Sequence, residues 1–160
     1  MKLRVAWLGR PATSPFESEV ESYRRQVSRR WPAEDRPLRP ASDGRDRDPA
    51  RALRRERELL ERAAEPGWLV VALDERGRRF DSPGFAHWLA GCADRGVPGV
   101  LFAVGSDLGL DRGFADRAEE QLSLSDLTLP HLLARLVLWE QLFRATRILG
   151  GGSYHRDVVQ

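Results

Sequence analysis

The sequence predicts an α/β domain with a mainly parallel sheet and helices on both of its faces. Residues 68–73 and 100–104 form two continuous apolar runs, which is the pattern of central parallel strands buried on both faces. Segments with the apolar spacing of helices separate the strand-like runs along the chain. Strands that alternate with helices are typical of layered α/β domains. We therefore expect a single domain over residues 1–160, which is long enough to bury a core.

Two elements and a long loop are predicted before the second helix. Residues 3–8, which are apolar except for Arg4, predict a buried strand. Residues 16–31 predict a helix with one apolar face, and Ser14 is a candidate N-cap. Residues 32–49 hold four prolines and predict a loop around one short edge strand near residues 36–39.

The middle of the chain continues the alternation. Residues 50–64 carry Arg and Glu at i,i+4 spacing and predict a second helix. The charged residues 74–77 predict a turn after the first apolar run, and residues 82–96 predict a helix opened by Ser-Pro. A short helix over residues 111–120 and a half-buried strand over residues 122–125 follow the second apolar run.

The last predicted helix spans residues 130–148. Thr128 is a candidate N-cap, Pro130 lies in the first turn, and the glycines at 150–152 end the helix. Apolar side chains cover every direction of its first half: Leu132, Leu133, Leu136, Val137, Leu138 and Trp139. A helix that is apolar all round must be covered on two sides. We expect the sheet to cover one side and a second copy in a homodimer to cover the other, with Leu138 facing the partner.

Composition limits the classes of site. Lys2 is the only lysine and the formal net charge is +2, so nearly all basic groups are arginines, which bind phosphate oxygens through their forks. A GC-rich genome also explains this excess of arginine over lysine.

Cys92 is the only cysteine, which excludes an internal disulfide and a cysteine metal cluster, and no His or carboxylate spacing predicts a metal site. No apolar run reaches the length of a membrane span and no signal peptide is predicted, so we expect a cytoplasmic protein.

A ligand site is expected where the predicted parallel strands end, because such sheets bind ligands at their carboxyl edge. Loops follow Leu73, Val104 and Ser125 at this edge. Gly105 and Gly109 allow the backbone of one loop to approach a ligand, although tight turns after strands use glycine as well.

The C-terminal tail is the second candidate region. Tyr154, His155 and Arg156 follow three glycines and bring a phenol, an imidazole and a guanidinium together. Either a frayed tail or a flexible part of an active site explains this pattern. His131, at the start of the last helix, has either a structural or a chemical role.

Residues spread along the whole chain match one known family in order and spacing. They are residues 1–3, Gly9, residues 23–25, 73–74, Gly77, residues 85–86, 102–109, 122–125 and 127–131, Arg135, Glu140, Leu142, residues 144–145 and residues 154–156. In these residues the sequence resembles the SPOUT-class methyltransferases of the ribosomal RNA large subunit methyltransferase H group. The likeness is most specific in the last third of the chain.

The resemblance implies a fold, a cofactor and a substrate. The C-terminal segment would thread a loop and form a trefoil knot, which is rare among folds. The enzyme would be a homodimer packed through the last helix, and it would methylate N3 of a pseudouridine in 23S ribosomal RNA of the large subunit. The cofactor would be S-adenosylmethionine, held by Leu73, Gly105, Ser106, Gly109, Leu124, Ser125, Asp126, Leu127, Thr128, Leu129 and Pro130.

The same resemblance gives roles to the tail. N3 of pseudouridine is a weakly acidic imide that must lose a proton, and a neutral histidine is a suitable base. His155 is the first candidate for this base and His131 the second. Tyr154 would stack on the base or hydrogen-bond to it, and Arg156 would hold a phosphate or stabilise the imide anion.

The chain departs from the family pattern at two positions of the expected cofactor site. The family usually has two consecutive glycines where this chain has Gly105 and Ser106, and Asp126 places an acid in the last cofactor loop. Ser106 motivates one alternative, a catalytically inactive RNA-binding relative of the same fold. A second alternative, independent of these departures, is a flavodoxin-like nucleotide-binding protein. We expect Ser106→Gly to bind the cofactor equally or more tightly.

Overall fold

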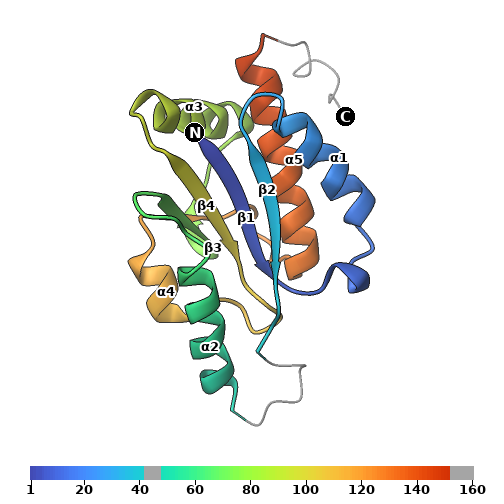
Figure 1. Cartoon of the computed structure of the whole chain (residues 1–160), viewed down its shortest axis with the longest axis vertical. Helices are drawn as coiled ribbons and strands as arrows, with labels where there is room; N and C mark the ends of the chain where they lie inside the picture. The colour runs from blue at the N-terminus through green and yellow to red at the C-terminus, as the bar shows by residue number, and fades with distance from the viewer. Residues whose placement is uncertain (42–47, 152–160) are drawn as a thin grey trace.

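The computed structural model describes residues 1–41 and 48–151, and over these ranges it has one parallel sheet of five strands (Figure 1). The strands are β1 (Lys2–Leu8), β2 (Ala33–Leu38), β3 (Leu69–Arg78), β4 (Gly99–Val104) and β5 (Glu120–Leu122). The helices are α1 (Glu17–Val27), α2 (Pro49–Glu61), α3 (Ser82–Asp94), α4 (Arg112–Arg117) and α5 (His131–Leu149), with a short 3-10 helix at Pro11–Thr13. The strand order is β2-β1-β4-β3-β5, and each neighbouring pair is parallel.

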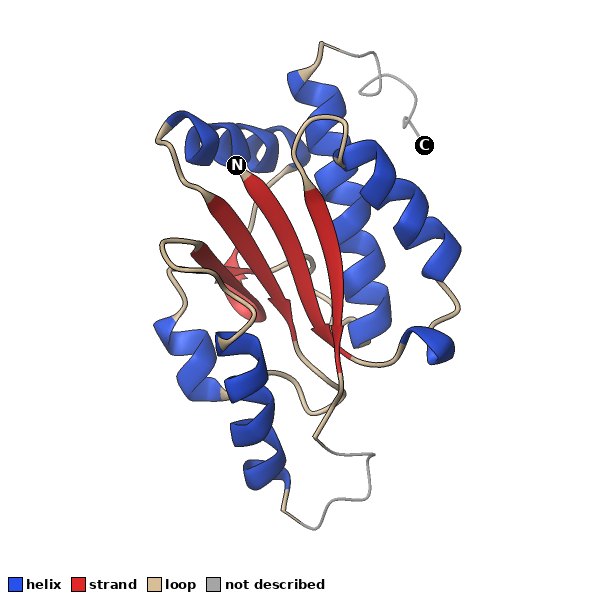
Figure 2. Cartoon of the chain, viewed as in Figure 1, coloured by secondary structure: helices blue, strands red, loops and turns tan. Residues whose placement is uncertain are grey.

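Helices cover both faces of the sheet (Figure 2). On one face α1, α3 and α5 share an apolar core with the sheet, to which they contribute residues such as Val20, Leu89 and Leu138. On the other face α2 and α4 bury Leu60 and Phe114 against a second core. Both cores exist because β1 and β4 are apolar on both faces and almost fully buried. The predicted α/β class with a parallel sheet is confirmed.

Three helices begin at an aspartate that caps them. The side chains of Asp48, Asp81 and Asp111 accept the backbone N–H groups of Arg51, Gly84 and Phe114 at 3.0, 2.7 and 3.0 Å. A carboxylate at the N-cap satisfies an N–H that has no partner inside the helix. Proline in the first turn of α2 and α3 fits the same start.

The predicted turn at residues 74–77 is wrong, because β3 continues to Arg78 with a register shift between Leu73 and Arg78. Gly77 makes this pairing sterically feasible. A Cβ atom at Gly77 would lie 2.5 Å from the carbonyl carbon of Gln121, so only glycine lets the two backbones come so close. The extension places the charged residues 74–76 in a strand at the carboxyl edge of the sheet.

The predicted strand at residues 122–125 is also displaced. The paired strand β5 is Glu120–Leu122, and α4 ends earlier than expected, at Arg117. The Ser123 hydroxyl donates to the carbonyl of Ser125 at 3.1 Å, and this local bond stabilises a loop directly after β5.

Neither predicted serine or threonine N-cap is present. Ser14 accepts the N–H of Phe16, but α1 begins at Glu17 and its N-cap, Phe16, makes no side-chain cap bond. The N-cap of α5 is Pro130 rather than Thr128, again without a side-chain cap bond.

The side of α5 that points away from the core is not the side that we expected. Leu138 is fully buried in the core, so the prediction that it faces a partner is wrong. Leu133 and Val137, one turn apart, are only partly buried and belong to neither core. The apolar residues left for another surface to cover are therefore on this side of the helix.

Candidate functional site

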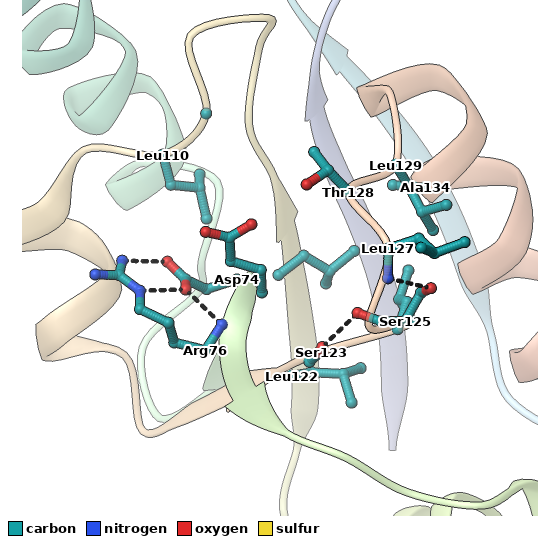
Figure 3. Close-up of a pocket in the computed structure, with 14 residues that line it drawn as sticks. Asp74, Arg76, Leu110, Leu122, Ser123, Ser125, Leu127, Thr128, Leu129 and Ala134 are labelled. Atoms are coloured by element: carbon teal, nitrogen blue, oxygen red, sulfur yellow. Dashed lines mark hydrogen bonds and ion pairs between the residues drawn. The ribbon is translucent and has the colours of Figure 1, made fainter.

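A cavity of about 350 Å³ opens at the carboxyl ends of the strands, beside the start of α5 (Figure 3). Its volume falls in the range of small-molecule sites. The lining comes from β3, from the loop after β4, from the loop after β5 and from α5: Leu73, Asp74, Glu75, Arg76, Gly109, Leu110, Leu122, Ser123, Leu124, Ser125, Leu127, Thr128, Leu129 and Ala134. The mixture of leucines, carboxylates and hydroxyls fits a ligand with one apolar part and one cationic or polar part.

The structure brings seven of the eleven predicted cofactor residues to this cavity. They are Leu73, Gly109, Leu124, Ser125, Leu127, Thr128 and Leu129. Gly105, Ser106, Asp126 and Pro130 are outside the lining. Asp126 instead forms an ion pair with Arg79, which follows the end of β3.

Sequence reasoning missed the charged part of the lining. Asp74, Glu75 and Arg76 were assigned to a turn, so their side chains were not considered for the site. The signal that could have found them is their position directly after the buried run of β3, at the edge where parallel sheets bind ligands. Leu110 and Ala134 were missed because no pattern in the sequence shows which side of a loop or helix meets a cavity.

Asp74 is the charged group of the cavity that accepts several hydrogen bonds. Its carboxylate accepts from the backbone N–H of Arg76 at 3.0 Å and from the Arg76 guanidinium at 2.9 Å through both oxygens (Figure 3). The Arg112 guanidinium lies 3.5 Å from the same carboxylate. Burial raises the pKa of Asp74, but the hydrogen bonds from Arg76 outweigh it and hold that pKa below its usual value. The carboxylate is therefore ionised at neutral pH.

Residues 123–130, here called the serine loop, form the opposite wall. The backbone N–H of Leu127 donates to the Ser125 hydroxyl at 2.9 Å, and the Ser123 N–H donates to the Arg78 carbonyl at 2.9 Å. These bonds anchor the loop to β3 and turn it toward α5. Leu127 is 77% exposed at the rim, where a ligand or another surface could cover it.

Residues 105–110, here called the glycine loop, reach the cavity only with their last two residues. A Cβ atom at Gly105 would lie 2.4 Å from the Gly109 carbonyl oxygen, so this glycine is required by the packing of the loop on itself. Gly109 has φ +79°, a conformation that favours glycine. Gly105 thus shapes the site indirectly, by allowing Gly109 to reach the lining.

The two candidate bases have different positions. His131 is the first residue of α5, and its Nδ1 lies 2.8 Å from a carboxylate oxygen of Asp107 in the glycine loop. This contact joins two walls of the site, although His131 itself does not line the cavity. Tyr154, His155 and Arg156 lie outside the described residues.

Comparison with known proteins identifies the family of this chain. A family model described as "Predicted SPOUT methyltransferase" matches residues 1–155. The chain belongs to the SPOUT methyltransferase family. This membership confirms the resemblance and the prediction of a methyltransferase enzyme, and it rules out the flavodoxin-like alternative.

Curated relatives match this SPOUT methyltransferase over nearly its whole length. A protein of Geobacter metallireducens is 35% identical over 158 residues, which cover 98% of this chain and 100% of the relative. Proteins of Allorhizobium ampelinum and Acidiphilium cryptum are 36% and 40% identical, over 98% and 97% of this chain and 100% and 94% of the relatives. All three carry the name "Ribosomal RNA large subunit methyltransferase H".

Two further properties concern the described part of this SPOUT methyltransferase. Within residues 1–41 and 48–151, no cluster of three or more His, Cys, Asp or Glu side chains could hold a metal ion. No helix in the same ranges is long and apolar enough to cross a bilayer. The trefoil knot of the C-terminal segment is an expectation that follows from the family.

Proposed function

We propose that this SPOUT methyltransferase transfers a methyl group from S-adenosylmethionine to N3 of a pseudouridine in 23S ribosomal RNA, acting on the large subunit or the assembled ribosome. The observation that carries the proposal is the cavity between β3, the glycine loop and the serine loop. The proposal is supported by the relatives named "Ribosomal RNA large subunit methyltransferase H", which match 98% of this chain. The proposed place of action is the cytoplasm, and the proposed unit is a single domain over residues 1–160.

The lining fits the methyl donor by its chemistry. The donor combines an adenine ring with a cationic sulfonium and an ammonium group, and when bound it supplies a methyl group activated by the sulfonium. Leucines of the serine loop and of β3 offer an apolar surface for the ring. Asp74 and Glu75 place two carboxylates opposite one guanidinium, Arg76, so the charged lining has a net negative charge that suits a cation.

The residues of the chain would orient the reactants and manage one proton. Holding donor and acceptor in line is the largest contribution that such a site can make. We assign removal of the N3 proton to His155, with His131 as the second candidate, and contacts to the base and phosphate to Tyr154 and Arg156. His131 has a competing structural role, because Asp107 already engages its Nδ1.

Removing the tail tests these assignments. Truncation after Gly152 should leave cofactor binding intact and abolish methyl transfer, and His155→Ala should recover part of its rate at high pH, where the imide loses its proton unaided. The readout is transfer of a labelled methyl group to large subunits that lack the modification. Full activity of the truncated protein would move the base to His131.

The active form is proposed to be a homodimer through α5. Leu133 and Val137 leave an apolar strip on this helix that belongs to neither core. The purified protein should show twice the 18.1 kDa mass of one chain in light scattering, and Val137→Glu should give folded monomers. His87→Glu, at an exposed position of α3, is the matched control. A wild-type mass of one chain at micromolar concentration would overturn this proposal.

Calorimetry tests the cofactor site directly. Wild-type protein should bind S-adenosylmethionine with one site per chain, and Ala134→Phe should abolish binding because the new ring would fill the cavity. His87→Phe on the exposed surface of α3 should bind as the wild type does. Unchanged binding by folded Ala134→Phe would place the cofactor elsewhere.

A further inference from the structure

Glu56, in the middle of α2, is a buried acid whose position needs an explanation. Its side chain is 2% exposed, and no other acidic residue in the described ranges is buried to this degree. A buried carboxylate is unfavourable unless hydrogen bonds compensate for the lost water. Two bonds do so: the backbone N–H of Ala41 donates to Oε1 at 3.1 Å, and the Ser106 hydroxyl donates to Oε2 at 2.8 Å.

Ser106 connects this carboxylate to the glycine loop. The backbone N–H of Leu108 donates to the Ser106 hydroxyl at 3.2 Å, and the N–H of Gly109 donates to the Ser106 carbonyl at 2.9 Å. Gly109 and the next residue, Leu110, line the cavity. A short series of contacts therefore leads from the interior of α2 to the wall of the site.

The glycine loop is fixed from two sides. Glu56 holds it from α2, which packs on one face of the sheet, and the 2.8 Å contact between Asp107 and the His131 ring nitrogen holds it from α5, which packs on the other. Between these anchors, Gly105 and Gly109 have no side chains to bond to the rest of the protein, and the loop packs closely on its own backbone at Gly105. The hydrogen bonds of Ser106 therefore act together with this packing to fix the path of the loop.

We propose that Glu56 is a positioning residue for the methyl-donor site, acting through Ser106 on Gly109 and Leu110. Glu56 touches neither reactant. It keeps the glycine loop in the conformation that completes the cavity wall, and so raises affinity for the donor without taking part in the transfer. The inference rests on the proposed use of S-adenosylmethionine. It reverses the expectation that Ser106→Gly would bind equally or more tightly.

The test measures S-adenosylmethionine binding and steady-state kinetics for Glu56→Ala, Ser106→Ala and the double variant. Ser106→Ala should raise the dissociation constant and KM for the donor about tenfold, which is the size expected for losing a hydrogen bond to a charged group. Its kcat at saturating donor should stay within about twofold, because the lost interaction affects binding. The double variant should bind the donor no more weakly than Glu56→Ala does, since both changes remove the same hydrogen bond between Ser106 and Glu56.

Glu61→Ala is the matched control on the same helix. Glu61 pairs with Arg57 and Arg117 and does not contact the glycine loop, so its loss should leave donor affinity unchanged. Glu56→Gln, which keeps an acceptor oxygen at the same place, should recover part of the affinity lost in Glu56→Ala. Amide hydrogen exchange without ligand should be faster at Leu108 and Gly109 in Ser106→Ala, and unchanged in Glu61→Ala.

The outcomes separate this inference from the proposed function. If the wild type binds the donor and Ser106→Ala binds equally well, the positioning role is wrong and the proposed function stands. Additive effects of Glu56→Ala and Ser106→Ala would also overturn it, because they would show two independent contributions. If the wild type does not bind the donor at all, the proposed function and this inference fail together.

Discussion

Two groups of arginines and carboxylates lie on opposite halves of the sheet, and they differ in burial. In the first, the Asp35 cluster, the Arg135 side chain is 1% exposed and contacts Asp35 at 2.6 Å and Glu17 at 2.5 Å. It also lies 3.9 Å over the ring of Trp7. In the second, the Asp74 cluster, Asp74 pairs with Arg76 and Arg112, and more than half of each arginine side chain is exposed.

The partners of the two carboxylates explain their different roles. Asp35 accepts hydrogen bonds from Trp7, Trp139 and Arg135, all of them groups of the protein itself. Burial lowers the pKa of Arg135, but the hydrogen bonds that Arg135 donates to Glu17 and Asp35 reverse the effect and raise this pKa. Asp74 shares its oxygens with two half-exposed arginines, Arg76 and Arg112, and lines a cavity. A buried and fully engaged cluster supports the fold, whereas a half-exposed one can exchange a partner for a ligand.

Removal of Asp35 should have the largest effect on stability. Asp35→Ala leaves the Arg135 charge buried with fewer partners, and a broken buried pair costs about 3–5 kcal/mol. Urea denaturation measures the free energy of unfolding of this variant against the wild type. A loss below about 1 kcal/mol would mean that the Asp35 cluster behaves like a surface ion pair.

Removal of the Asp74 charge should weaken binding of S-adenosylmethionine while leaving the stability of the fold almost unchanged. Asp74→Asn should change the free energy of unfolding by less than about 1 kcal/mol, because its arginine partners are exposed. The same variant should weaken S-adenosylmethionine binding about tenfold, as expected for a lost interaction with a charged group. S-adenosylhomocysteine, which lacks the sulfonium charge, serves as the control ligand and should lose less affinity. Equal losses for both ligands would argue against a charge effect at the sulfonium.

Acid pH should produce the smallest of these effects, which we expect at Asp74. Because the folded state lowers the pKa of Asp74, its ion pair stabilises the fold above the unfolded pKa of about 3.9 and is lost as pH falls through the lower folded value. The stability difference between wild type and Asp74→Asn should stay constant from about pH 7 to about pH 5, begin to shrink near about pH 4 and vanish only below the folded pKa of Asp74. A difference that grows on acidification would contradict the direction of the shift.

The sequence predicts the layers of this fold well, because β4 and the first half of β3 are continuous apolar runs and β1 is apolar apart from Lys2 and Arg4. Such runs are typical of buried parallel strands. The sequence predicts the ends of strands and helices less well where a tertiary contact determines them. The extension of β3 depends on the approach of Gln121 to Gly77, and the early end of β5 depends on a hydroxyl bond of Ser123. Neither contact has a local signature.

In the site, too, some features are predicted from the sequence and others depend on tertiary contacts. The glycines and serines at the strand ends are visible in the sequence, and most of the predicted cofactor residues line one cavity. The roles of Glu56 and Asp35 are not visible in the sequence, since each is one acid among many in a chain with 24 of them. Burial distinguishes Glu56, and the hydrogen bonds accepted from Trp7, Trp139 and Arg135 distinguish Asp35. The inward position of Leu138 and the outward position of Val137 likewise follow from packing, because α5 is apolar in every direction.

The central claim, methylation of N3 of a pseudouridine in 23S ribosomal RNA, is tested most directly by identifying the product. Large subunits that lack the modification are incubated with the protein and S-adenosylmethionine carrying an isotopically labelled methyl group. Their RNA is then digested to nucleosides for mass spectrometry. The account predicts the label in one nucleoside, N3-methylpseudouridine, and its loss in the Ala134→Phe variant. Label in another nucleoside, or no label despite cofactor binding, would contradict the account.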